Sequence, residues 1–270
     1  MFASALIAFR EGLEAALIVG IVLGVLRKLG HAQRGGSVWA GVGAAVIASV
    51  AVGLILNALG VAFEGRGEQI FEGVVMLLAA MVLTWMIFWM QRQGRHIQAE
   101  LESDVRRATA AGSGWALFGL AFVAVLREGI ETALFLTAAA FSATPMQTLT
   151  GGTLGLAVAV VLGWLIFTAG KRLNVRAFFR VTSVLLVLFA AGLVAQAVHE
   201  FQEAALLPAL VEQVWDVADE YIRPILDERS GVGALLKALF GYNGNPSLLE
   251  VIAYGVYVAV VSAFGLRKLT

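Results

Sequence analysis

The sequence predicts an all-α membrane protein with seven transmembrane helices, arranged as two inverted three-helix repeats followed by a seventh helix. The 270-residue chain is 60% hydrophobic and 14% charged, its mean hydropathy is +0.86, and one short charged motif occurs twice in it. A soluble domain of this size does not carry so large an apolar fraction. Cysteine is absent and the formal net charge is zero, which excludes disulfides and thiolate metal sites and indicates no nucleic-acid partner.

Seven segments are long and apolar enough to cross about 30 Å of hydrocarbon, which takes about 20 residues of helix. They lie at about residues 2–26, 38–63, 69–91, 114–139, 150–170, 178–200 and 247–266. The first segment lacks a basic leading region and itself contains the charged motif, so we expect a retained span and not a cleaved signal peptide. We therefore expect residues 1–270 to form a single transmembrane domain.

The basic residues predict the orientation of these spans, because loops that are rich in lysine and arginine stay in the cytoplasm. Basic residues cluster after the first, third, fifth and seventh segments, and few lie in the other connections. We expect the N-terminus outside the cell and the C-terminus in the cytoplasm, so that the chain is a multi-pass protein of the cytoplasmic membrane. The cytoplasmic set is Arg27, Lys28, Arg34, Arg92, Arg95, Arg106, Arg107, Lys171, Arg172, Arg176, Arg180, Arg267 and Lys268, against Arg66, Arg223, Arg229 and Lys237 outside.

The duplicated motif defines the repeats. Arg-Glu-Gly-Leu-Glu at residues 10–14 recurs as Arg-Glu-Gly-Ile-Glu at residues 127–131. Each copy lies in the first span of a three-span group, so repeat 1 covers about 1–91 and repeat 2 about 114–200. An odd number of spans turns the second repeat upside down, and such inverted repeats hold their substrate near mid-membrane at the repeat interface.

The motif residues are functional candidates, because ionisable groups inside a span are costly unless they are paired or bind an ion. Glutamates three positions apart share one helix face, and an arginine four positions before a glutamate can pair with it. Gly12 and Gly129 allow another helix to approach the carboxylates closely. Carboxylate oxygens suit hard cations, and a surplus of carboxylates over arginines favours a multivalent one. We expect the metal ligands to be Glu11, Glu14, Glu128 and Glu131, with Arg10 and Arg127 as ion-pair partners.

A purely structural role for the motif remains open, in which each copy is an internal salt bridge that packs helices together. One arginine and one glutamate would satisfy that role. Each copy has a second glutamate, which we expect to be unmatched.

Acidic residues also gather at the predicted outer ends of the spans, where they form a candidate vestibule that concentrates cations. The alternative is an ordinary solvated acidic rim. Between the sixth and seventh spans, apolar residues from Leu207 to Ile225 recur at helical spacing, so the outer segment 201–245 is expected to include an amphipathic surface helix. The vestibule candidates are Glu68, Glu72, His199, Glu200, Glu203 and Glu250.

At these motifs the sequence resembles the oxidase-dependent iron permeases, a family that includes the fungal high-affinity iron permease and the bacterial Efe-type ferrous iron permease. Residues 10–14 have the family signature, and residues 127–131 match it with isoleucine for leucine. Residues 199–203 look like the family's Glu-x-x-Glu element, and residues 239–254 look like the bacterial members.

The resemblance implies a permease and not an enzyme, with iron as the transported substrate, no cofactor, and the motif glutamates handling the ion. In the family a partner oxidises Fe(II) and passes Fe(III) to the permease. The expected partners are therefore iron, membrane lipid, and an extracytoplasmic ferroxidase or iron-delivery protein. Since some relatives are assigned to lead, a broader divalent-metal or lead permease remains an alternative.

Two functions of a different class are disfavoured by the histidines. An intramembrane metalloprotease would need two or more histidine ligands, and an electron-carrying subunit would need paired axial histidines for haem. Of the three histidines, His31 and His96 fall in predicted cytoplasmic loops, and only His199 borders a span.

Overall fold

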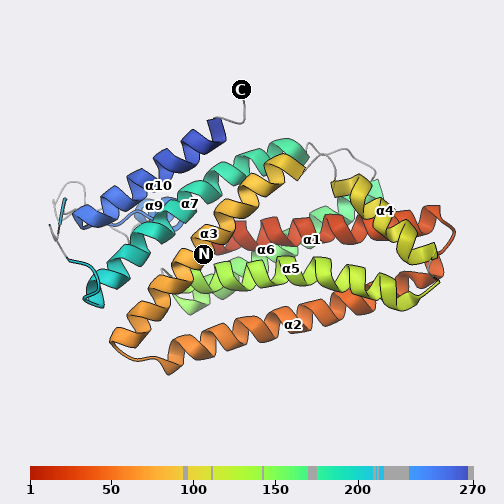
Figure 1. Cartoon of the computed structure of the whole chain (residues 1–270), viewed down its shortest axis with the longest axis horizontal. Helices are drawn as coiled ribbons and strands as arrows, with labels where there is room; N and C mark the ends of the chain where they lie inside the picture. Colours follow the sequence, from red (N-terminus) through yellow and green to blue (C-terminus); the bar gives the residue numbers. More distant parts are fainter. Residues whose placement is uncertain are drawn as a thin grey trace.

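The computed structural model describes residues 1–93, 97–110, 112–141, 143–169, 175–208, 211, 213–215 and 231–266. Within these residues the chain is helical and contains no strand (Figure 1). The elements in chain order are α1 (Phe2–Lys28), the 3-10 turn η1 (Ala32–Arg34), α2 (Gly35–Ala62), α3 (Arg66–Gln93), α4 (Ile97–Ala110), α5 (Gly114–Phe141), α6 (Pro145–Ala169), α7 (Val175–Glu203), α9 (Gly231–Phe240) and α10 (Leu248–Leu266).

Each of the seven predicted segments coincides with one long helix, and the all-helical class is confirmed. Five stretches of the described chain are long and apolar enough to cross a membrane: Ala32–Ala62, Arg66–Met90, Pro145–Phe167, Arg180–Glu203 and Leu248–Gly265. The helices α1 and α5 are also long enough to cross a membrane, at 27 and 28 residues. They differ from the five stretches because each contains the arginine and both glutamates of a motif copy.

The helix α4 was not expected, because it lies in a polar connection between two predicted spans. It forms because tertiary contacts bury two of its small apolar side chains. Val105 and Ala108 pack in one cluster with Val22 and Leu26 of α1 and with Leu117 of α5. Burial of its apolar side against neighbouring helices thus stabilises a segment that is polar on average.

The helix expected from Leu207 onward does not form at the residues that the structure describes there, whereas a ten-residue helix, α9, lies later in segment 201–245. The helix α7 ends at Glu203, and residues 204–208, 211 and 213–215 are non-helical. Here the backbone bonds to the chain before α10: the Val214 N–H donates to the carbonyl of Pro246 at 2.9 Å, and the Leu248 N–H donates to the carbonyl of Val211 at 3.2 Å. These bonds replace helical ones. Residues 209, 210, 212 and 216–230 lie outside the described residues.

The helices pair across the sequence. The helix α1 packs against α6, α2 against α5, and α3 against α7, while α1 also contacts α5 and α7 contacts α10. In Figure 1, α1, α2, α5 and α6 run along the long axis, and α3, α7 and α10 cross them obliquely. A buried apolar cluster between α1, α3, α5 and α7 includes Ile7, Met76, Phe135 and Leu193. The two motif helices therefore lie side by side inside the bundle.

The motif glycines permit this packing, as the sequence predicted. A Cβ atom on Gly12 would lie 2.9 Å from Leu156 Cδ1 and 3.0 Å from Ala159 Cβ of α6, and one on Gly129 would collide with the Ser49 side chain of α2. Small residues matter here, because inside a membrane helices associate through close packing and not through the hydrophobic effect. The outward faces of α2 and α6 are apolar and exposed, as at Ile47 and Trp164, which suits contact with lipid.

Candidate metal site

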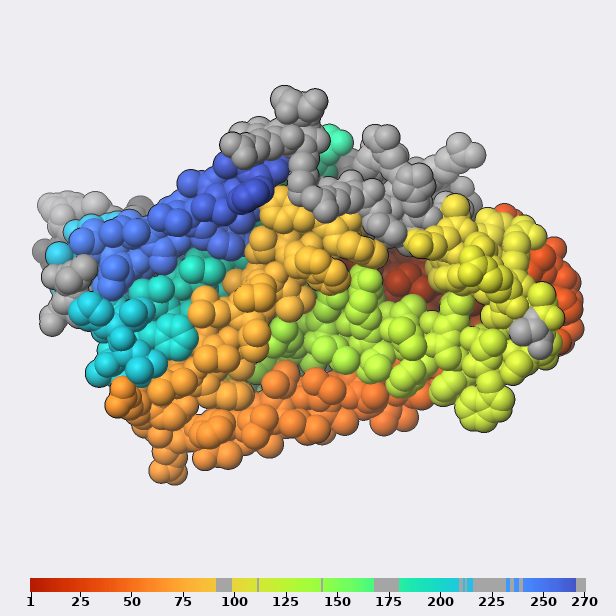
Figure 2. All heavy atoms as spheres, in the orientation of Figure 1, coloured from red at the N-terminus to blue at the C-terminus, as the bar shows by residue number. Residues whose placement is uncertain are grey.

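Five of the six charged motif side chains are buried in the centre of the bundle. Arg10 is fully buried, and Glu11, Glu14, Glu128 and Glu131 are each at most 9% exposed. On the face shown in Figure 2, part of α1 is seen at the bottom of a hollow bounded by α3, α4 and α5. Such burial of charge requires partners, because each unpaired charge in an apolar interior costs several kcal/mol.

In the first motif, one arginine serves both glutamates. Arg10 Nη1 lies 2.8 Å from Glu11 Oε1, and Arg10 Nη2 lies 3.0 Å from Glu14 Oε1. The expectation of a second, unmatched glutamate is therefore wrong. The guanidinium is a planar fork with donors on several nitrogens, so it reaches the neighbouring glutamate as well as the one four residues ahead.

The second motif repeats this arrangement in a more open form. Arg127 Nη2 lies 3.2 Å from Glu128 Oε1, and Arg127 Nε lies 3.3 Å from Glu131 Oε1. The side chain of Arg127 is 38% exposed, whereas that of Arg10 is 0% exposed. In both copies the arginine thus pairs with both glutamates, but the arginine of the second copy is more exposed.

Carboxylates from the two motifs converge. One oxygen from each of Glu11, Glu128 and Glu131 lies within 4.8 Å of the other two. The Oε2 atoms of these three residues are buried and accept no hydrogen bond from a described residue. Clustered carboxylates repel one another in an apolar interior, and a multivalent cation would remove that repulsion. Oxygen donors of this kind suit hard ions such as ferric iron, manganese or magnesium.

Glu14 stands apart from this trio. The sequence predicted four glutamate ligands, but one of them, Glu14, lies outside the group of three oxygens, although it pairs with Arg10 as Glu11 does. Glu14 remains buried and close enough for its charge to interact with both Arg10 and Arg127. It is therefore a neighbour of the converging oxygens and not one of them.

Sequence reasoning missed the helix that contacts both arginines. Arg10 donates from Nη1 to Met86 Sδ at 3.1 Å and from Nη2 to Met90 Sδ at 2.8 Å. The guanidinium carbon of Arg127 lies 4.6 Å from the ring centroid of Trp89. All three partners belong to α3. Methionine and tryptophan in an apolar helix are ordinary in a sequence, so no pattern could have singled them out.

The expected vestibule residues lie near the end of α7 and the starts of α3 and α10. Gln69 donates from Nε2 to Glu203 Oε2 at 3.1 Å, which connects α3 to α7. Glu68 and Glu203 are exposed, and Glu72 and Glu200 are partly buried. The four carboxylates form one acidic region at this end of the molecule, since Glu72 interacts electrostatically with the other three.

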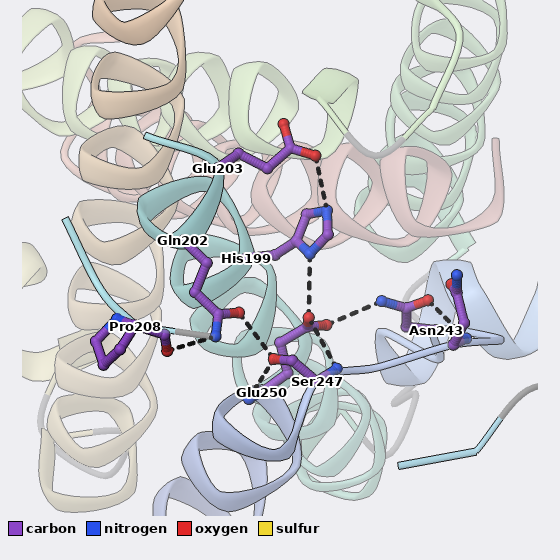
Figure 3. Close-up of polar contacts among 8 residues, drawn as sticks. His199, Gln202, Glu203, Pro208, Asn243, Ser247 and Glu250 are labelled. Carbon is purple, nitrogen blue, oxygen red and sulfur yellow. Dashed lines mark hydrogen bonds and ion pairs between the residues drawn. The ribbon is translucent and has the colours of Figure 1, made fainter. Parts of the chain in front are cut away.

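Glu250 differs from the other vestibule candidates because it is buried, and both of its oxygens have partners (Figure 3). Its Oε1 accepts the Ser247 N–H at 3.2 Å and lies 3.0 Å from His199 Nδ1, and its Oε2 accepts from Asn243 Nδ2 at 2.9 Å. The Ser247 hydroxyl in turn accepts the Glu250 N–H at 3.3 Å. This reciprocal pair is a capping box that begins α10. His199 also lies near Glu203, with Nε2 3.3 Å from Oε1.

Known proteins resemble this chain over nearly its whole length. The family model described as the Iron permease FTR1 family matches residues 1–269. The chain is 38% identical over 269 residues to the ferrous iron permease EfeU of Shigella sonnei and to that of Escherichia coli O157:H7, covering 98% of this chain and 96% of each relative. It is 36% identical over 260 residues to the ferrous iron permease EfeU of Yersinia pestis, covering 96% of this chain and 90% of the relative. No solved structure matches the chain.

Proposed function

The chain belongs to the iron permease FTR1 family, and from this membership we propose that it carries iron inward across the cytoplasmic membrane through the buried carboxylates of its two motifs. It is a multi-pass membrane transporter with iron as its substrate, and not an enzyme. The relatives that it matches over nearly their whole length are ferrous iron permeases.

One observation carries the proposed site: the convergence of Glu11, Glu128 and Glu131 within 4.8 Å. The three carboxylates come from both repeats, they are buried, and each has an oxygen without a hydrogen-bond partner among the described residues. A cation between them would be held by α1 and α5 together. Glu14, paired with Arg10 beside them, supplies a fourth carboxylate to which a passing ion can transfer.

The proposed topology has seven spans, with the N-terminus outside and the C-terminus in the cytoplasm. Repeat 1 covers about 1–91 and repeat 2 about 114–200, and the second is inverted. Helix pairing supports this arrangement. In the repeats α1 corresponds to α5, α2 to α6 and α3 to α7. Under this correspondence the α1–α6 pair is equivalent to the α5–α2 pair, and the α1–α5 and α3–α7 pairs are each equivalent to themselves. A two-fold axis in the membrane plane produces this pattern.

We further propose that the ion enters as Fe(III) supplied by an extracytoplasmic ferroxidase or iron-delivery protein. Carboxylates are hard ligands, which favours Fe(III) over Fe(II). The chain has three histidines and no cysteine, so oxidation is assigned to a partner. Glu68, Glu72, Glu200 and Glu203 would attract the cation before it enters the bundle.

Uptake of radioactive iron by proteoliposomes tests the site. Glu128→Gln keeps the shape of the side chain and removes its charge, and we expect it to abolish uptake while the protein still folds. Glu102→Gln is the matched control, because Glu102 pairs with Arg106 on the surface helix α4 and should transport normally. Normal uptake by Glu128→Gln would reduce the motif to a helix-packing salt bridge and refute the proposed site.

Supplying Fe(II) and Fe(III) separately distinguishes the oxidation states, and competition by other metals distinguishes the alternative function. Uptake of Fe(III) alone supports the oxidase-dependent route. If lead or manganese reduces labelled iron uptake as strongly as the same concentration of unlabelled iron does, the chain is a broader divalent-metal permease.

A further inference from the structure

The two motif arginines are held by the same face of the same helix. Met86, Trp89 and Met90 follow the i, i+3, i+4 spacing of α3, so their side chains project from one side of it. Met86 and Met90 contact Arg10, and Trp89 contacts Arg127. We name these three residues the α3 clamp.

The terminal nitrogens of Arg10 contact both α1 and α3. Its Nη1 lies 2.8 Å from Glu11 Oε1 and 3.1 Å from Met86 Sδ, and its Nη2 lies 3.0 Å from Glu14 Oε1 and 2.8 Å from Met90 Sδ. Each terminal nitrogen therefore lies close to a carboxylate and to a thioether. A thioether is a weak acceptor, but it binds the guanidinium without carrying a competing negative charge. It can orient the arginine without drawing it away from the glutamates.

Arg127 is held differently. Its guanidinium carbon lies 4.6 Å from the Trp89 ring centroid, and that ring stacks on Trp85 with centroids 6.3 Å apart. A cation over a tryptophan face is attracted by the ring quadrupole, most strongly where water is scarce. Because Arg127 is 38% exposed, the indole adds a contact to a guanidinium that also pairs with Glu128 and Glu131.

We propose that the α3 clamp consists of positioning residues for iron transport: Met86 and Met90 orient Arg10, and Trp89 orients Arg127, so that Glu11, Glu128 and Glu131 stay aimed at one point. The inference rests on the proposed function of those carboxylates. The helix α3 is well placed for this role, because it packs on both α5 and α7 and its Met86 is fully buried. Outer partners that orient ligands commonly change metal affinity by about 10–100-fold when they are removed.

The test compares apolar variants that lose the contact, of which the methionine-to-leucine changes nearly keep the side-chain volume. In proteoliposomes, Met86→Leu/Met90→Leu and Trp89→Leu should each raise the apparent KM for iron about three- to tenfold, which is below that range because they act through the arginines. Trp89→Phe keeps an aromatic face and should restore most of the affinity. Met76→Leu is the matched control, since Met76 is equally buried in α3 within the apolar core and should leave KM unchanged.

Thermal unfolding of each purified variant distinguishes positioning from simple packing. A raised KM with an unchanged Tm, together with rescue by Trp89→Phe, supports the clamp. A wild-type KM in the leucine variants, or a loss that follows a fall in Tm equally in Met76→Leu, overturns it. If the double variant does not fold, Met90→Leu alone carries the test of the Arg10 contacts. Glu128→Gln is assayed alongside: if it transports normally, the proposed function fails, and if it is inactive while the leucine variants are normal, the clamp alone fails.

Discussion

Nδ1 of His199 in α7 lies 3.0 Å from Oε1 of Glu250 in α10, although the two residues are 51 positions apart in the chain. Around this contact, Asn243 and Ser247 bind the same carboxylate, and Gln202 accepts a hydrogen bond from the Ser247 hydroxyl at 2.8 Å. Figure 3 shows that these groups surround the first turn of α10. The contact therefore anchors α10 to the end of α7.

We expect Glu250→Ala to lower stability more than it lowers transport. The variant loses the capping box and the contacts to His199 and Asn243, and loss of a helix cap alone costs about 1 kcal/mol. Thermal unfolding in detergent measures the effect, and Glu102→Ala, whose pair with Arg106 lies on the surface helix α4, is the control. Complete loss of iron uptake at an unchanged Tm would instead make Glu250 part of the ion route.

The motif glycines should not tolerate a methyl group. In Gly129→Ala the new Cβ collides with the Ser49 side chain, and overpacking of this kind costs about 1–3 kcal/mol. We expect a lower Tm and a lower yield of folded protein, with partial rescue by adding Ser49→Gly. Gly119→Ala in the same helix is the control, because nothing lies within 4 Å of its added Cβ. An unchanged Tm in Gly129→Ala would contradict the close approach of α2 and α5.

Arg10→Lys should impair transport although it retains the positive charge. Arg10 binds Glu11 and Glu14 through two different nitrogens, and a lysine ammonium cannot reproduce this planar fork. We expect uptake to fall about tenfold, as for loss of a charge-assisted hydrogen bond worth about 1.5 kcal/mol. Arg106→Lys is the control, because its pair with Glu102 is solvent-exposed and such pairs contribute little. Equal uptake by Arg10→Lys and wild type would show that charge alone is required.

The proposed orientation can be tested directly, because the chain has no cysteine. Single-cysteine variants at Gln33 in η1 and at Glu64 between α2 and α3, both exposed, report on opposite sides of the membrane. In intact cells a membrane-impermeant maleimide should label Glu64→Cys, and it should label Gln33→Cys only after the cells are opened. The reverse pattern would invert the topology and place the acidic region of Glu68 and Glu72 in the cytoplasm.

The sequence by itself determined the helices and the chemistry of the motifs. Hydropathy and helix length are local properties, so each long helix could be located from the residues that it contains. The burial of Glu11 and Glu128 followed from their position within apolar segments. The Ser-x-x-Glu pattern at Ser247 and Glu250 also carried a readable capping signal, although the acidic side chain was assigned to the vestibule.

The tertiary structure alone decided which groups meet. Three glutamates converge while Glu14 stays beside Arg10, and this asymmetry depends on how α1 and α5 are rotated against each other. The contacts of Met86 and Trp89 with the arginines, and the packing that stabilises α4, join residues far apart in the chain. Such contacts depend on the relative placement of whole helices, which no local periodicity encodes.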